Sequence, residues 1–171
     1  MKKKSIYLFL LLFIFVLSAC SQSPDFKLYK GKSLRIAVIG ELPKVREKHV
    51  SFKEISFNEL TSEKVISFDA VFITKENLPK AAESQYAKIY LNSTIPFFFI
   101  QAKSHLPFIE EEIVYNESWK WTVGNDYAVG VLVDDELLRN WGFGLYNDKK
   151  NGKHIKDVYS RIFETIEKLN Y

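Results

Sequence analysis

Four runs of residues in the first two-thirds of the chain predict β-strands. Residues 33–40 (SLRIAVIG) form a continuous apolar run that ends at a glycine, which is typical of a strand covered on both faces. Residues 68–74 and 95–100 have the same character, and Pro96 falls at a strand start, where its missing N–H costs least. Residues 50–57 alternate between apolar and polar, which predicts a shorter strand nearer an edge.

One segment between these strands is rich in helix-forming residues. Residues 79–91 place Ala82, Tyr86 and Ile89 on one stripe of a predicted helix. Strand, helix and strand in this order predict a parallel pair with a right-handed crossover. This part of the chain therefore resembles flavodoxin-like proteins in the order of its strands and helices.

The C-terminal third predicts an antiparallel meander followed by a closing amphipathic helix. The predicted strands are residues 119–123, 127–133 and 138–146, with turn signals at 124–126 and 134–136, and the helix covers residues 154–170. An alternative for residues 134–140 is a helical turn with Asp134 as N-cap. Together with the parallel part, the pattern predicts a single three-layer α/β domain with a mixed sheet over residues 33–171.

Two features of the meander have both a functional and a packing interpretation. Trp119 and Trp121 lie on one face of a predicted strand, where an exposed pair could bind a protein partner or stack on sugars, and a buried pair would be core. Gly142 and Gly144 lie on the face opposite Phe143, where the lack of side chains favours close approach of another element. The closing helix or a bound ligand would fill that space.

The N-terminus has the parts of a secretory signal. Lys2, Lys3 and Lys4 precede an apolar run over residues 6–16, and Leu17-Ser18-Ala19-Cys20 follow. The run is too short to span a bilayer, which needs roughly 20 apolar residues. The last four residues resemble the lipobox of bacterial lipoprotein precursors, in which a leucine, a small residue and an alanine precede an invariant cysteine.

This resemblance implies a modified and processed N-terminus. Cys20 would carry a diacylglyceryl group, cleavage would fall between Ala19 and Cys20, and two acyl chains would hold the protein on the extracytoplasmic face of a membrane. The alternative is an ordinary signal peptide cut at Ala19. The sequence thus predicts a signal at residues 1–19 and, because residues 21–32 are polar, a lipidated tether at residues 20–32.

Charge and cysteine content limit the chemistry of the domain after cleavage. Three of the 24 basic residues lie in the signal and none of the 21 acidic residues does, so the remaining chain is neutral and shows no sign of nucleic-acid binding or of an anionic-membrane footprint. Cys20 is the only cysteine, which excludes an intramolecular disulfide and a cysteine nucleophile.

The residues that follow the predicted parallel strands are the candidates for a ligand or metal site. Glu41, Thr74, Glu76 and His105 come after three such strands, and in open α/β sheets ligands bind at the carboxyl ends. Carboxylates and a histidine could bind a metal or act as an acid–base pair. The alternative is that these residues are polar because loops are solvated.

Known catalytic and cofactor motifs do not occur in the sequence. There is no glycine-rich phosphate loop and no Gly-x-Ser-x-Gly elbow, and Thr74 stands where a phosphoryl receiver would have its aspartate. The sequence predicts no cofactor. The leading hypothesis is a membrane-anchored, non-enzymatic module that binds a protein partner or a small ligand. The alternative is a small hydrolase or metal-dependent enzyme using the strand-end acidic residues and His105.

Overall fold

A computed structural model describes residues 24–116, 125–135 and 137–169. The signal, Ala19 and Cys20 lie outside these residues. So do Trp119 and Trp121 and the strand predicted at 119–123, so their assignments stay predictions. Within the described ranges, no helix is long and apolar enough to cross a membrane.

One six-stranded mixed sheet forms the centre of the domain. Its strand order is β2-β1-β3-β4-β5-β6, with parallel pairing from β2 to β4 and antiparallel pairing from β4 to β6. The bounds are β1 Leu34–Ile39, β2 Val50–Glu54, β3 Ala70–Ile73, β4 Phe97–Ile100, β5 Asp126–Asp134 and β6 Leu137–Gly144. The predicted α/β class is confirmed, and β2 lies at an edge as its alternating pattern indicates.

A tight turn joins β5 to β6. Asp134 pairs with Leu137 in the ladder, and Asp135 between them has a left-handed backbone with φ of 48°. The hairpin is therefore correct and the alternative helical turn at Asp134 is wrong. The antiparallel ladder holds the backbone of the paired residues in an extended conformation, so they cannot also form the first turn of a helix.

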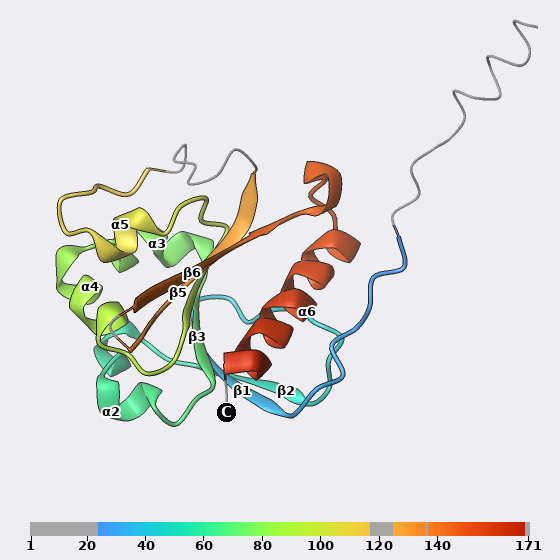
Figure 1. The fold of residues 1–171 in the computed structure, drawn as a ribbon, viewed down its shortest axis with the longest axis horizontal. Coiled ribbons are helices and arrows are strands. Elements are labelled where there is room, and N and C mark those ends of the chain that lie inside the picture. The colour runs from blue at the N-terminus through green and yellow to red at the C-terminus, as the bar shows by residue number, and fades with distance from the viewer. Residues whose placement is uncertain (1–23, 117–124, 136, 170–171) are drawn as a thin grey trace, which may run out of the picture.

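Helices cover both faces of the sheet, which gives three layers (Figure 1). One face packs against α2 Ser62–Val65, α3 Leu78–Ala81, α4 Ser84–Leu91 and α5 Leu106–Ile109, with the short 3-10 helices η1 Phe57–Glu59 and η2 Lys75–Asn77. The other face packs against α6 Gly152–Leu169, which follows the short 3-10 helix η3 Tyr146–Asp148. Along β4, Phe97 and Phe99 point to the first layer and Phe98 to the second.

The helix predicted at 79–91 is interrupted. Glu83 has an extended backbone (φ −68°, ψ 136°), so α3 ends at Ala81 and α4 begins at Ser84. The hydroxyl of Tyr90 donates to the carbonyl of Ala81 at 2.9 Å, which satisfies a group that the helix end leaves unpaired. Tyr90 and Ala87 are the buried residues of α4, while the predicted stripe is only half-buried.

The closing helix does not pack on the glycine face of β6. Phe143 lies in the core cluster that contains α6, so α6 covers the aromatic face. A Cβ at Gly142 would lie 2.6 Å from Oδ2 of Asp126, a residue of the neighbouring strand. Gly142 therefore makes room for a side chain across the ladder, and the expectation of a helix docked on it is wrong. At Gly144 the helix does approach, since Arg161 of α6 donates to the glycine carbonyl at 2.6 Å.

The polar segment before β1 packs along α6 (Figure 1). Tyr29 is 1% exposed, and its hydroxyl donates to the carbonyl of Lys32 at 3.0 Å. The N–H of Lys32 in turn donates to Glu167 of α6 at 2.9 Å. Polar composition predicted a tether through residue 32, but residues 24–32, here called the strap, belong to the packed domain.

Candidate functional site

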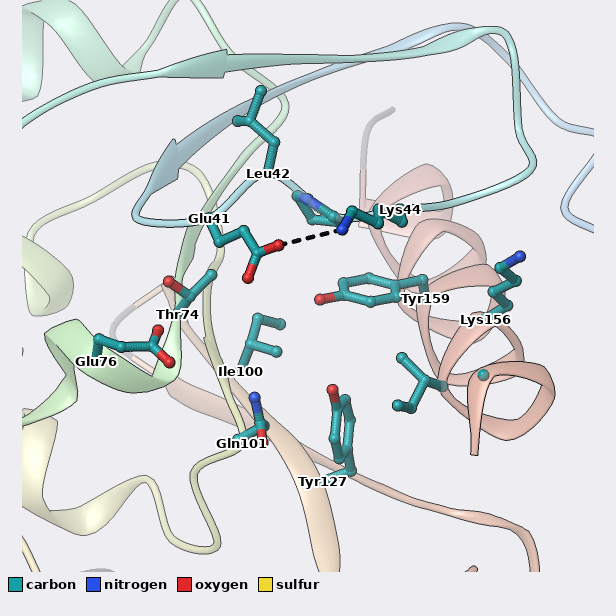
Figure 2. A pocket seen from close by; sticks show the side chains of 13 residues that line it. Glu41, Leu42, Lys44, Thr74, Glu76, Ile100, Gln101, Tyr127, Lys156 and Tyr159 are labelled. Carbon is teal, nitrogen blue, oxygen red and sulfur yellow. Dashed lines mark ion pairs between the residues drawn. The ribbon is translucent and has the colours of Figure 1, made fainter. Parts of the chain in front are cut away.

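A pocket of about 380 Å³ opens at the carboxyl ends of β1, β3 and β4 (Figure 2). The chain leaves β1 toward β2 on one side, while β3 lies on the other, so the strand order reverses here. Open α/β sheets bind ligands at such a point. The residues that line the pocket are Glu41, Leu42, Pro43, Lys44, Thr74, Glu76, Ile100, Gln101, Tyr127, Gly152, Ile155, Lys156 and Tyr159.

Two buried tyrosines supply hydrogen-bonding groups to the pocket. Tyr127 from β5 and Tyr159 from α6 are 8% and 6% exposed, and in Figure 2 both hydroxyl groups point toward the space beneath the Glu41 carboxylate. Burial raises the pKa of both phenols, and for Tyr159 the nearby Tyr127 and Glu41 raise the pKa further. Both phenols are therefore neutral at physiological pH, and each can donate one hydrogen bond to a ligand.

Thr74 shapes the pocket through its contact with Gly40. Its hydroxyl lies 3.3 Å from the carbonyl of Ile39, to which it donates, and Thr74 is only 6% exposed. Gly40 has φ of 109°, and a Cβ there would lie 1.9 Å from the Thr74 hydroxyl oxygen. This close approach lets the chain turn sharply from β1 into the segment that carries Glu41.

Gln101 is the strained residue of the site. It follows β4 with a left-handed φ of 68°, which is unfavourable for a side chain that is not glycine. Its N–H donates to the carbonyl of Tyr127 at 2.6 Å, and its side-chain oxygen accepts from Lys150 Nζ at 2.6 Å. Surrounding contacts thus hold a backbone conformation that costs of order 1–3 kcal/mol, and such strain clusters at functional sites.

The charged groups of the pocket lie at its rim. Glu41 and Lys44 form an ion pair of 3.6 Å with side chains 77% and 89% exposed, drawn as a dashed line in Figure 2. Exposed pairs of this kind contribute little to stability and can reorient around a ligand. With Glu76 and Lys156 the lining holds two carboxylates and two ammonium groups, so the rim is balanced in charge.

Three of the four strand-end residues predicted from sequence line this pocket, and the fourth does not. Glu41, Thr74 and Glu76 come together, whereas His105 is buried just before α5. Burial lowers the pKa of His105. Among the residues that the structure describes, no group of three or more His, Cys, Asp or Glu side chains could hold a metal ion.

Sequence reasoning missed two buried polar groups of the site, Tyr127 and Tyr159, although it included the equally buried Thr74. Tyr127 and Tyr159 lie on a strand and a helix whose periodicity indicates packing, and nothing local separates a core tyrosine from one that opens into a pocket. Gln101 could have been recognised from sequence, because it directly follows β4. Residues that follow a parallel strand lie at the edge of the sheet where ligands bind in open α/β folds.

A second hollow of about 390 Å³ adjoins the first and shares Gln101 and Tyr127 with it. Its charged lining consists of Lys75, Lys103, Lys150, Asp126 and Asp148. Lys150 lies 5.9 Å from the ring centroid of Tyr127 and donates to the Gln101 side chain, so its ammonium group contacts both residues that the two hollows share. Taken together, the two hollows form a candidate site in which the part under Glu41 is balanced in charge and the part beyond Gln101 is rich in lysine.

Comparison of the chain with protein-family models, with curated proteins and with solved structures finds no match. Function is therefore inferred from the geometry of the pocket and from the N-terminal sequence.

Proposed function

We propose that this protein is a lipoprotein held on the extracytoplasmic face of a membrane through Cys20, and that its domain binds a small polar ligand without altering it. The observation that carries the binding proposal is the convergence of two buried phenols and a carboxylate on one pocket at the reversal of strand order. The anchoring proposal comes from the lipobox resemblance at Leu17–Cys20.

The chemistry of the pocket indicates the class of ligand. Neutral phenols donate to hydroxyl, carbonyl or carboxylate oxygens, and Glu41 accepts from hydroxyl or ammonium groups. A balanced rim complements a ligand that carries both charges or none. Free amino acids, short peptides and sugar-containing cell-wall fragments meet this description, whereas a strongly anionic nucleotide does not.

Thermal unfolding of a lipid-free form that begins at Ser21 tests the binding proposal. Amino acids, sugars, cell-wall fragments, nucleotides and divalent metals would be added one class at a time. A ligand at about 100 times its Kd contributes roughly 2.7 kcal/mol, which raises the unfolding midpoint of a domain of this size by several degrees. Tyr159→Phe and Tyr127→Phe should weaken that shift, because each keeps the ring and removes the donor.

Tyr86→Phe is the matched control. Tyr86 packs on the opposite side of the sheet, against Phe57, so loss of its hydroxyl should leave the ligand shift unchanged. A flat response to every class would reject the small-ligand proposal in favour of a protein partner. A shift produced by a divalent metal and lost in Glu41→Gln would favour the metal-dependent enzyme instead.

Anchoring has a separate test in cells that express the full chain. The protein should sediment with membranes and carry acyl chains on Cys20, and Cys20→Ser should abolish the acylation. A full chain that is secreted without lipid would show that Ala19 ends an ordinary signal peptide.

A further inference from the structure

The strap leaves the domain beside the start of α6. Phe26 makes edge-on contacts with Tyr146 and His154, at centroid distances of 5.7 and 5.4 Å, and Lys153 Nζ lies 5.5 Å from its ring centroid. Further along the strap, Tyr29 stacks on His49 and contacts Phe163. These contacts fix the direction in which the chain enters the domain.

Few residues separate this point from the proposed lipid. Only Ser21, Gln22 and Ser23 lie between Cys20 and Pro24. At about 3.3–3.6 Å per residue, the four steps from Cys20 to Pro24 span at most about 14 Å. An anchor at Cys20 therefore keeps the end of the domain that carries Phe26 close to the lipid headgroups.

The same end carries a local excess of positive charge. Residues 24–27 and 146–156, here called the anchor-proximal surface, hold five lysines and two aspartates, whereas the chain from Cys20 onward holds 21 basic and 21 acidic residues. The lysines are Lys27, Lys149, Lys150, Lys153 and Lys156, of which all but the half-buried Lys156 are exposed. The neutral total conceals this asymmetry, because the rest of the domain carries the balancing negative charge.

We propose that the anchor-proximal surface rests on an anionic lipid bilayer and so fixes how the domain stands on the membrane. This inference depends on the anchoring part of the proposed function. Lysines near an anionic leaflet are attracted to it within about a Debye length, which is roughly 8–10 Å at physiological salt. Tyr146, 36% exposed, is of the amphipathic aromatic type that occupies the headgroup level.

This orientation also places the candidate ligand pocket. Gly152, Ile155 and Lys156 belong to both the first turns of α6 and the pocket lining. The pocket therefore lies at the membrane-facing end of the domain. A ligand would be met at the bilayer surface and not far out in solution.

Site-directed spin labelling of the lipidated protein tests this orientation. Acylation consumes the only cysteine of the chain, so one introduced cysteine takes a single nitroxide. Gly152→Cys suits the anchor-proximal surface, because a Cβ there meets no atom within 4 Å. Ser67→Cys is the matched control, since Ser67 is exposed and precedes β3 at the amino ends of the parallel strands.

In phosphatidylcholine–phosphatidylglycerol vesicles, the collision rate of the label at 152 with a water-soluble relaxing agent should fall several-fold. The collision rate should recover in pure phosphatidylcholine, and also near 1 M salt, where the Debye length is about 3 Å. The label at 67 should stay accessible throughout. Lys149→Glu with Lys153→Glu should abolish the protection at 152, whereas the exposed pair Lys53→Glu with Lys88→Glu should not.

The outcomes separate the two proposals. A protein that carries the acyl mass on Cys20 but shows equal accessibility at 152 and 67 overturns the orientation and leaves the anchor intact. Protection at 152 that persists in pure phosphatidylcholine overturns the electrostatic contact. A mature chain without acyl mass overturns anchoring, and the orientation fails with it.

Discussion

Single residues at the pocket end of the sheet, where the parallel strands have their carboxyl ends, adopt conformations held by the surrounding packing. Gly40 has a backbone conformation open mainly to glycine, and the Thr74 side chain occupies the space where a Cβ would point. Gln101 has a left-handed backbone held by hydrogen bonds at both its N–H and its side chain. The shape of this edge of the sheet thus depends on Gly40, where Thr74 leaves no room for a side chain, and on Gln101, whose backbone is held by its neighbours.

Replacement of Gly40 should be much more costly than replacement of Gly152. Gly40→Ala should lower the free energy of unfolding by about 2–4 kcal/mol, through its positive φ and the clash with Thr74. Gly152→Ala should be neutral or raise it by up to about 1 kcal/mol, because helix propensity improves in open space. Urea unfolding of the two variants measures the difference, and equal effects would contradict this account of the turn after β1.

His105 should make stability depend on pH in the weakly acidic range. Burial lowers its pKa from the ordinary value of 6.5, so below that pH the unfolded chain takes up a proton that the folded domain resists. This contribution to stability is complete above about pH 6.5 and is lost as pH falls through the folded pKa. His105→Gln should flatten this part of the profile, and denaturant unfolding at several pH values compares the two proteins.

Among the secondary structure elements, α6 organises one whole side of the domain. It buries Val158, Ile162, Phe163 and Ile166 against the sheet, receives the strap along its length and supplies Tyr159 to the pocket. Segments without regular structure are fastened to it by specific hydrogen bonds. The strap and the segment after β1 therefore depend on this helix for their positions.

The strap should contribute to stability as a core element does. Tyr29→Ala removes a ring that is 1% exposed, and we expect it to cost about 3–5 kcal/mol, the range of large aromatic truncations. Lys30→Ala, at the exposed neighbouring position, should change stability by less than about 0.5 kcal/mol. If urea unfolding gave the two variants the same midpoint, the strap would behave as a loose tether.

The segment that carries Glu41 and Lys44 is linked to α6 by a buried carboxylate. Glu47 is 3% exposed, accepts from the Ser160 hydroxyl at 2.5 Å and accepts from the N–H of Arg46 at 2.9 Å. The link holds one wall of the pocket against the helix.

Removal of the Ser160 hydroxyl should therefore destabilise the domain. Ser160→Ala leaves the Glu47 oxygen without its partner, at a cost of about 1–3 kcal/mol. Thr165→Ala on the same helix is the control, because its hydroxyl donates to the Arg161 carbonyl one turn away, and it should cost less. Chemical denaturation ranks the two, and a larger loss in Thr165→Ala would contradict the role of Glu47.

For the molecule as a whole, one sheet joins two apolar clusters that lie on its opposite faces. Adjacent residues of the same strand alternate between them, as Phe97, Phe98 and Phe99 do along β4. Neither cluster can come apart without loss of the strands that support the other. The candidate pocket and the point where the strap leaves the domain also lie at the same end of the molecule. Both proposals therefore assign function to that end.

The shared sheet predicts a single unfolding transition. Far-ultraviolet circular dichroism and tryptophan fluorescence should give the same midpoint in urea, as expected of a two-state domain of this size. Two separated midpoints would show that one layer unfolds independently of the other.

The sequence by itself determined the identity of the main strands and helices. Continuous apolar runs marked β1, β3 and β4, turn residues marked the hairpin, and helical periodicity marked α6. These signals are local, because each depends only on whether successive side chains face water or the interior. The strand-end rule also brought Glu41, Thr74 and Glu76 to one edge, since the carboxyl ends of parallel strands share an edge.

Tertiary structure decided which neighbour each buried face meets. Periodicity does not show that the glycines of β6 accommodate Asp126, that Tyr90 bonds the carbonyl at the end of α3, or that Tyr29 enters the core from a polar segment. It also does not show that Tyr127 and Tyr159 meet in the pocket while His105 lies elsewhere. The physical reason is that burial can be read from the type of a residue and from the periodicity of its segment. Contact between distant residues depends on strand order and helix placement, which are determined by the whole chain.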